Sequence, residues 1–188
     1  MSKNKQEDIF AAAMELFAVR GYDGTTVPMI ANKAKVGAGT IYRYFENKES
    51  LVNALFVKCV EEFFDVIQTD FPKDADIRQQ FHHIFRRMFV FAKDNGNALQ
   101  FINSHDEGYY LDEKSNQTFQ DFLGFIRQVI EDGKKQGVIR PLPADAHIAT
   151  VYGAFGMLFS LMQSGRLTET QELLTELEDS LWNAIRIH

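Results

Sequence analysis

The sequence predicts an all-α protein with about nine helices. Apolar residues recur at helical spacing along the whole chain, no segment alternates as a strand does, and glycines or prolines separate the apolar runs. Of the 188 residues, 45% are hydrophobic, which is ample for a packed core. This composition excludes a disordered or fibrous protein.

The first fifty residues predict three short helices and the start of a long one. An amphipathic helix over 6–20 ends at Gly21, and a second helix follows its expected N-cap, Thr26. A tight connection leads to a third helix over about 39–45. Asn47 caps the long fourth helix, which ends before Pro72 and joins the N-terminal module to the remainder of the chain.

Five further helices are expected beyond Pro72, separated by glycine and proline punctuation. Their expected ranges are 74–94, 97–105, 113–136, 144–164 and 169–187. Most of the fourth of these lies in an uncharged stretch of eighteen residues between His147 and Arg166. Its threonine, serine, glutamine and glycine residues favour a buried helix over a membrane span, so we expect no membrane partner.

Charge is distributed unevenly along the chain, whose net charge is −6. Residues 1–50 carry seven basic and six acidic side chains, whereas residues 51–188 carry 13 and 20. A DNA-binding surface therefore fits only the first fifty residues. The single cysteine, Cys59, excludes an intrachain disulfide and agrees with a cytoplasmic location.

Residues 26–45 have the features of a helix-turn-helix, because two short helices follow a scaffold helix and are separated by a tight turn. In this motif the second helix presents its N-terminal end to the major groove, and the first presents a helix N-terminus to phosphate. Thr26 supplies a hydroxyl at such an N-terminus. The second helix is crowded with side chains that reach phosphates or base edges: Thr40, Tyr42, Arg43 and Tyr44.

Three runs occur at fixed distances in this region: LFAVRGY over 16–22, TTVPMIA over 25–31 and GTIYRYFENKESL over 39–51. Their order and spacing resemble the DNA-binding domain of the TetR family of bacterial transcriptional regulators. The resemblance covers about a quarter of the chain, residues 9–51. It implies a DNA-binding domain over 1–50 and a helical ligand-binding and dimerisation domain over 51–188.

The resemblance also implies which side chains contact DNA. The residues concerned are Thr26, Gly39, Thr40, Tyr42, Arg43, Tyr44 and Lys48. Gly37 and Ala38 depart from the Ser or Thr and the basic residue that many members carry, so a base preference cannot be transferred. Other roles stay open: Tyr44 covers a hydrophobic seam, Arg43 pairs with Glu46, or Lys48 is a solvated surface charge.

The C-terminal part is rich in aromatic residues, with fourteen of the seventeen phenylalanines beyond position 50. The resemblance implies a ligand cavity between these helices, and an aromatic lining suits a hydrophobic or amphipathic small molecule. The expected lining residues are Phe85, Phe89, Phe101, His105, Tyr109, Phe122 and Phe155. The alternative is that the phenylalanines only fill the core and that 104–113 is an ordinary polar loop.

A symmetric homodimer is expected to form through the last two helices, because one chain is too small to bury both of their apolar faces. The expected interface residues are Ala149, Gly153, Gly156, Ser160, Leu174, Leu177, Leu181 and Trp182. Two-fold symmetry would place the recognition helices ~34–36 Å apart and would require a roughly palindromic operator.

These features together predict a ligand-responsive repressor that binds double-stranded DNA and is released by an inducer. A small helical enzyme is the alternative from another class, but the sequence has no nucleophile elbow, P-loop, dinucleotide fingerprint or zinc spacing. We therefore expect no catalytic residue, cofactor or metal. A second alternative is an architectural DNA-binding protein without a ligand.

Overall fold

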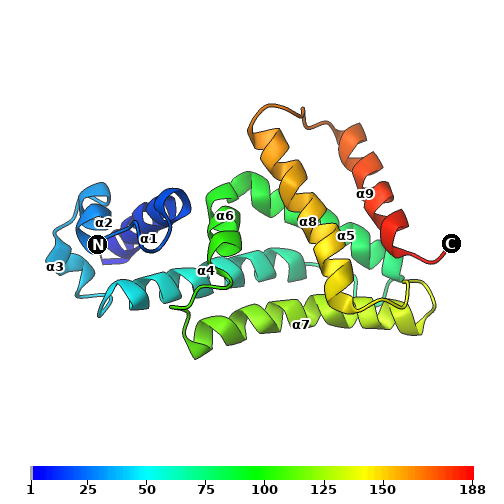
Figure 1. Ribbon diagram of the computed structural model, residues 1–188, viewed down its shortest axis with the longest axis horizontal. Coiled ribbons are helices and arrows are strands. Elements are labelled where there is room, and N and C mark those ends of the chain that lie inside the picture. Colours follow the sequence, from blue (N-terminus) through cyan, green and yellow to red (C-terminus); the bar gives the residue numbers. More distant parts are fainter. Residues whose placement is uncertain (1) are drawn as a thin grey trace. The chain divides into compact units, whose positions relative to one another are not determined.

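The computed structural model describes residues 2–188, with side chains from Lys5 onward. Its helices, drawn in Figure 1, are α1 (Ser2–Arg20), α2 (Val27–Lys33), α3 (Ala38–Ile41), α4 (Lys48–Gln68), α5 (Ile77–Asp94), α6 (Gly96–His105), α7 (Glu113–Lys135), α8 (Ala144–Gln163) and α9 (Gln171–Ile185). Within this range the only extended pairing is one isolated bridge between Ile139 and Arg186. The all-α prediction is confirmed.

The chain forms two compact units. The first comprises residues 1–64 and 93–120, and the second comprises residues 65–92 and 121–188. Helices α4 and α7 each contribute residues to both units. The units describe packing, whereas the predicted division at residue 50 describes function and stays a prediction.

In the first unit, α1 packs against α2 and α6, and α2 packs against α3. Phe17 of α1 is fully buried, and its ring centroid lies 6.0 Å from that of Phe101 in α6. Phe56 of α4 contacts the other side of this cluster, 6.4 Å from Phe101. The amphipathic pattern of residues 6–20 thus has its physical basis in an aromatic core shared by three helices.

Side-chain caps begin two of the helices as predicted. The N–H of Met29 donates to the hydroxyl of Thr26, 3.4 Å away, at the start of α2. At the start of α4, the N–H of Ser50 donates to Asn47 Oδ1 (2.8 Å), and the N–H of Asn47 donates to Ser50 Oγ (3.1 Å). These reciprocal bonds satisfy donors that a helix N-terminus leaves unpaired.

Helix α2 ends in a Schellman motif. The N–H of Lys35 donates to the carbonyl of Asn32, and the N–H of Val36 donates to the carbonyl of Ala31. This motif needs a left-handed residue, and Lys35 adopts that conformation with φ +54°. A side chain therefore occupies a backbone conformation that glycine adopts more readily.

The third helix is shorter than the predicted range of 39–45. It begins after Gly37 and ends at Ile41. Beyond Ile41 the N–H of Tyr44 donates to the Ile41 carbonyl at three-residue spacing, so the chain continues as tight turns.

In the second unit, α5 contacts both α8 and α9 through aromatic side chains. The Phe89 ring meets Phe155 of α8 edge-on, with centroids 4.9 Å apart. The Phe81 ring packs against Trp182 of α9, with centroids 5.3 Å apart. The aromatic residues of this unit are therefore its main packing elements.

Candidate functional site

The predicted DNA-contacting side chains lie at the start of α2, on α3 and the turns after it, and at the start of α4. Thr26, Gly39, Tyr42 and Arg43 are exposed, and 55% of Tyr42 is accessible. Position 39 is open as well, because a Cβ added there would meet nothing within 4 Å. Short helices, an exposed cation and exposed hydroxyls form a surface that suits phosphates and base edges.

Two other predicted contacts, Thr40 and Tyr44, are half-buried. The Tyr44 ring lies 6.3 Å from the ring of Phe45, which is 6% exposed and belongs to the core. Tyr44 therefore covers part of the hydrophobic seam while keeping an accessible portion. The structure supports one of the alternative roles for Tyr44 without removing it from the surface.

Lys48 has partners inside the first unit that the sequence did not reveal. Its ammonium donates to the carbonyl oxygens of Tyr22 (2.8 Å) and Thr25 (3.1 Å). The same nitrogen lies 3.8 Å from the centroid of the Tyr22 ring, within cation–π range. Lys48 thus fastens the loop between α1 and α2 to the start of α4, and its contact with phosphate stays a prediction.

Sequence reasoning missed Asn53, which is only 4% exposed. Its side-chain amide donates to the carbonyls of Glu49 and Tyr110, and its carbonyl oxygen accepts from Asp112 N and Ser115 Oγ. The sequence feature that could have indicated a buried polar role for Asn53 is its position as a single asparagine within the apolar run of α4. A buried amide is retained at such a position when every polar atom has a partner.

The predicted ligand residues fall into two groups. Phe101, His105 and Tyr109 belong to the first unit, whereas Phe85, Phe89, Phe122 and Phe155 belong to the second. All but Tyr109 are buried. Tyr109 is 80% exposed, and its hydroxyl donates to Asp23 Oδ1 at 2.9 Å. The structure therefore places Tyr109 on the surface instead of in an enclosed lining, because it occupies the turn after α6.

His105 is the one member of this set with an unsatisfied polar atom. It is 1% exposed, and its Nδ1 donates to the carbonyl of Phe101 at 2.8 Å. Burial lowers the pKa of His105, although the hydrogen bond to Phe101 opposes this shift. In the neutral ring Nε2 is then an acceptor, and it has no partner among the described residues. A buried acceptor in this state is suited to a donor from a ligand.

A pocket of about 690 Å³ opens in the second unit, beside the connection between α4 and α5. Its walls come from that connection, α5 and α7, and include Phe71, Ile77, Gln80, Phe125, Gln128 and Asp132. None of the seven predicted ligand residues lines it. Several of its polar groups bond to one another: Gln80 donates to the carbonyls of Lys73 and Ala75, and Gln128 donates to Asp132.

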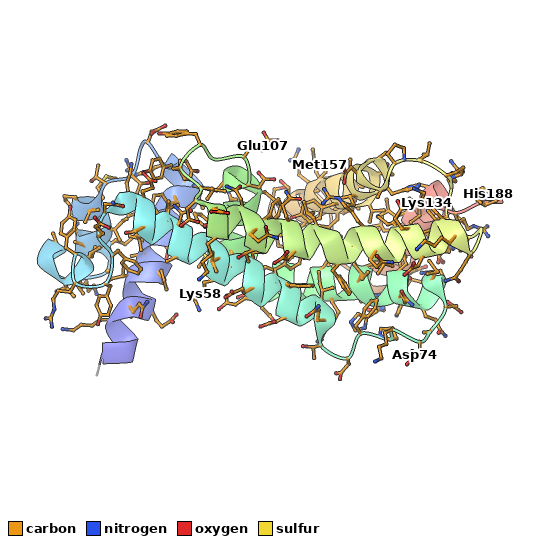
Figure 2. The ribbon with its side chains drawn as sticks, turned by 90° about the horizontal axis from the view of Figure 1, so that it is seen from below. Lys58, Asp74, Glu107, Lys134, Met157 and His188 are labelled. Carbon is orange, nitrogen blue, oxygen red and sulfur yellow. The ribbon has the colours of Figure 1, made fainter. Side chains whose placement is uncertain are left out.

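Helix α8 presents an apolar surface that its own unit leaves largely uncovered. Only His147 and Phe155 of this helix are buried. Ala149, Gly153 and Ser160 are exposed, Gly156 is half-buried, and Met157, labelled in Figure 2, is 63% exposed. Beyond its first turn, from Ile148 to Gln163, this helix carries no charged residue. Such a surface of small exposed residues is suited to close approach by another helix.

Helix α9 differs from the sequence prediction. Leu174 and Trp182 are buried within the subunit, where Trp182 packs on Phe81 of α5, so the structure places them inside the chain instead of against a partner. Leu177 and Leu181 are half-buried and keep part of their surface accessible. Periodicity revealed an apolar face on this helix but not which helix covers it.

In the part of the chain that the structure describes, no group of three or more His, Cys, Asp or Glu side chains is arranged to hold a metal ion. None of the helices in that part combines the length and apolar character needed to cross a bilayer.

Two family models match the chain. The model for the N-terminal domain of "bacterial regulatory proteins, tetR family" matches residues 9–55. The model described as "Tetracyclin repressor-like, C-terminal domain" matches residues 56–187, which is more than half of the chain. Together the two models confirm the resemblance in the N-terminal motif and extend it over the helices of the C-terminal part.

Individual proteins agree with these models. The chain is 28% identical over 138 residues to the fatty acid metabolism regulator protein of Bacillus subtilis, covering 72% of this chain and 71% of that protein. The crystal structure of a TetR family transcription regulator from Marinobacter aquaeolei VT8 matches with a TM-score of 0.89 at 19% identity, covering 99% and 97% of the two chains. The Bacillus subtilis regulator FadR in complex with stearoyl-CoA matches with a TM-score of 0.71 at 22% identity, covering 94% and 95%.

Proposed function

The chain belongs to the TetR family of bacterial regulatory proteins, and we propose that it is a ligand-responsive repressor that binds a palindromic operator as a homodimer. The observation that carries this proposal is the exposed surface at Thr26, Tyr42 and Arg43, on a helix-turn-helix that its caps hold rigidly. Residues 1–50 supply DNA recognition, and residues 51–188 supply ligand binding and dimerisation. Repression follows from occupancy, because a protein bound at the operator excludes the transcription machinery.

The exposed face of α8 supports the homodimer. We assign Ala149, Gly153, Gly156 and Ser160 to its centre, with the accessible edges of Leu177 and Leu181 beside them. A two-fold axis through this interface would place two recognition helices about one DNA turn apart, ~34–36 Å. The operator would then be a palindrome with matching half-sites.

The inducer is proposed to be a small amphipathic molecule with a long apolar part. In the first unit, buried Phe101, whose ring centroid lies 4.3 Å from that of His105, supplies apolar surface, and the unpartnered Nε2 of His105 supplies an acceptor for a ligand N–H or O–H group. Long-chain acyl-CoA thioesters are the first class to test, because the similar regulator FadR is known in complex with stearoyl-CoA. Inducer binding would shift the dimer toward a spacing that does not fit DNA.

The experiment that tests the proposal is enrichment of random DNA duplexes on the purified protein, followed by sequencing. A palindromic site is expected, and stearoyl-CoA should release the protein from it, whereas CoA without an acyl chain should not. Enrichment of a site without two-fold symmetry would overturn the dimer. Failure of folded, ligand-free protein to enrich any site would favour an architectural or enzymatic role.

A further inference from the structure

The segment between α6 and α7, residues 106–112, is fastened to the start of α4 by Asn53. Figure 2 labels Glu107 within this α6–α7 connection. Asn53 Nδ2 donates to the Tyr110 carbonyl at 2.8 Å, and its Oδ1 accepts from the N–H of Asp112 at 2.8 Å. Ser115, fully buried in the first turn of α7, donates to the same oxygen at 2.7 Å. Since all four hydrogen-bonding positions of a buried amide are used, the connection has one defined place on α4.

Tyr110 extends from this anchor onto the loop between α1 and α2. Its ring is 8% exposed and stacks on Tyr22, with centroids 3.9 Å apart and planes 19° from parallel. Gly108 makes room for it, because a Cβ at that position would lie 2.6 Å from the Tyr110 ring. Burial raises the pKa of Tyr110 to about 12, so the phenol is neutral where the protein would work. A ring pair this close adds stabilisation beyond buried area.

Tyr22 in turn lies next to the groups that set the start of α2. The Lys48 ammonium covers its ring and binds its carbonyl together with that of Thr25. Thr25 is fully buried, and its hydroxyl donates to the carbonyl of Gly21 at 2.8 Å. The next residue is Thr26, the N-cap of α2. An unbroken series of direct contacts thus joins the α6–α7 connection to the end of the helix that faces phosphate.

We propose that the α6–α7 connection is a clamp for DNA recognition, and that Tyr110 is a positioning residue that holds the N-terminus of α2 in place by stacking on Tyr22. This inference rests on the proposed function, since it concerns the same DNA-binding surface. Tyr110 itself does not touch DNA. Its contribution is to lower the cost of ordering the loop that carries Thr26 when the phosphate binds.

The test compares full-length variants on the enriched operator. Replacing Tyr110→Leu removes the stack and should weaken operator binding about three- to tenfold, whereas Tyr110→Phe keeps the ring and should stay within about twofold of the parent. Phe91→Leu is the control, because it also replaces a buried aromatic residue, but in α5 within the second unit. It should lower the melting temperature without weakening binding by the folded protein. Equal losses for Tyr110→Leu and Phe91→Leu, or for Tyr110→Leu and Tyr110→Phe, would overturn the clamp.

Gly108→Ala displaces the Tyr110 ring without removing a buried group. It is therefore a second test of the clamp if Tyr110→Leu does not fold. It should weaken operator binding in the same direction, and parent-like affinity would contradict the proposal.

Hydrogen exchange over residues 22–31 of the DNA-free protein separates the clamp from the proposed function. Exchange there should accelerate in Tyr110→Leu and Gly108→Ala but not in Tyr110→Phe or Phe91→Leu. If the parent enriches no DNA while exchange still accelerates in Tyr110→Leu and Gly108→Ala, the proposed function is refuted and the clamp stands. If the parent binds its operator but exchange in these two variants is unchanged, the clamp alone is refuted.

Discussion

In the first unit the residues predicted to bind DNA are exposed or half-buried, and polar contacts to the main chain hold the loops near them. In the second unit the groups predicted to bind a ligand are buried aromatic rings, and the contacts between helices include aromatic ring pairs and an ionic cluster on Glu178. Lys48 is an example of bonding to the main chain, and Glu178 is an example of bonding between side chains. Lys48 binds two carbonyl oxygens, whereas Glu178 of α9, 2% exposed, binds the side chains of Arg78, His82 and Arg86 from α5.

This difference shows where each unit tolerates change. A loop held by a few directional hydrogen bonds is sensitive to the loss of any one donor, while its exposed side chains are free to vary with the DNA sequence. Helices held by aromatic and ionic side chains lose stability when a buried partner is removed, but an exposed helix face such as that of α8 can change without unfolding the chain.

The largest expected effect is on assembly through the exposed face of α8. Gly153→Glu should weaken the dimer about a hundredfold or more, because two-fold symmetry brings two uncompensated carboxylates into the interface. The subunit should stay folded, since a Cβ at this position meets nothing within 4 Å. Light scattering after size exclusion measures the mass. Gly124→Glu, at an equally open glycine of α7, is the control, and a Gly153→Glu dimer as tight as that control would relocate the interface.

The ionic cluster predicts the next largest effect. Glu178→Ala leaves Arg78 and Arg86 without their buried partner and should lower the free energy of unfolding by about 2 kcal/mol. Chemical denaturation measures this change. Asp179→Asn, which removes an exposed carboxylate bound to Arg78 alone, should change it by less than about 0.5 kcal/mol. Similar losses for the two variants would show that the cluster does not organise the second unit.

The same cluster predicts a pH dependence. Burial alone would raise the pKa of Glu178, but hydrogen bonds from His82 and Arg78 lower it below its ordinary value of 4.5. A carboxyl whose pKa is lower in the folded state stabilises the protein above its ordinary pKa and loses this contribution as pH falls through the folded value. The stability difference between the parent and Glu178→Gln should therefore shrink as the pH falls below about 4.5. A difference that grows on acidification would contradict this assignment.

A substitution at Arg43 tests whether the exposed surface of the first unit contacts DNA bases specifically. Arg43→Ala should weaken operator binding by about 1–3 kcal/mol and relax the preference at one position of each half-site. Binding to a set of operators with single base changes measures both effects. A uniform loss across the whole set would instead assign Arg43 to a phosphate.

A substitution at Lys48 tests whether the ammonium that binds the loop carbonyls also contacts a DNA phosphate. Lys48→Met should weaken binding and also reduce the slope of log affinity against log salt by about 0.9, the value for one phosphate. Lys58→Met is the control on the same helix, because Lys58 pairs with Glu62 and Glu7 and should affect neither quantity. A loss of affinity with an unchanged slope would limit Lys48 to holding the loop.

The smallest expected effect concerns the left-handed residue after α2. Lys35→Gly relieves the Cβ crowding at φ +54° and should raise the free energy of unfolding by up to about 1 kcal/mol. Gly21→Ala, at φ +67°, should shift it in the opposite direction. Thermal unfolding compares the two, and a destabilised Lys35→Gly would mean that the lysine side chain contributes more than its backbone conformation costs.

The sequence by itself determined the helices, their caps and the recognition motif. Those features depend on neighbours within one or two turns: the period of the apolar residues, the hydroxyl of Thr26 at a helix start, or Asn47 paired with Ser50. Even the premature end of α3 is a local effect, since it arises from hydrogen bonds at three-residue spacing after Ile41.

Only the tertiary structure decided what each exposed or buried group contacts. The lysine at position 48 meets the carbonyls of Tyr22 and Thr25 across more than twenty residues of chain, and Tyr110 reaches Tyr22 across nearly ninety. Periodicity marks a face of α9 as apolar, but it does not tell whether α5 or another molecule covers Trp182. The physical reason is that pairing between distant segments depends on the arrangement of whole helices, which no local pattern encodes.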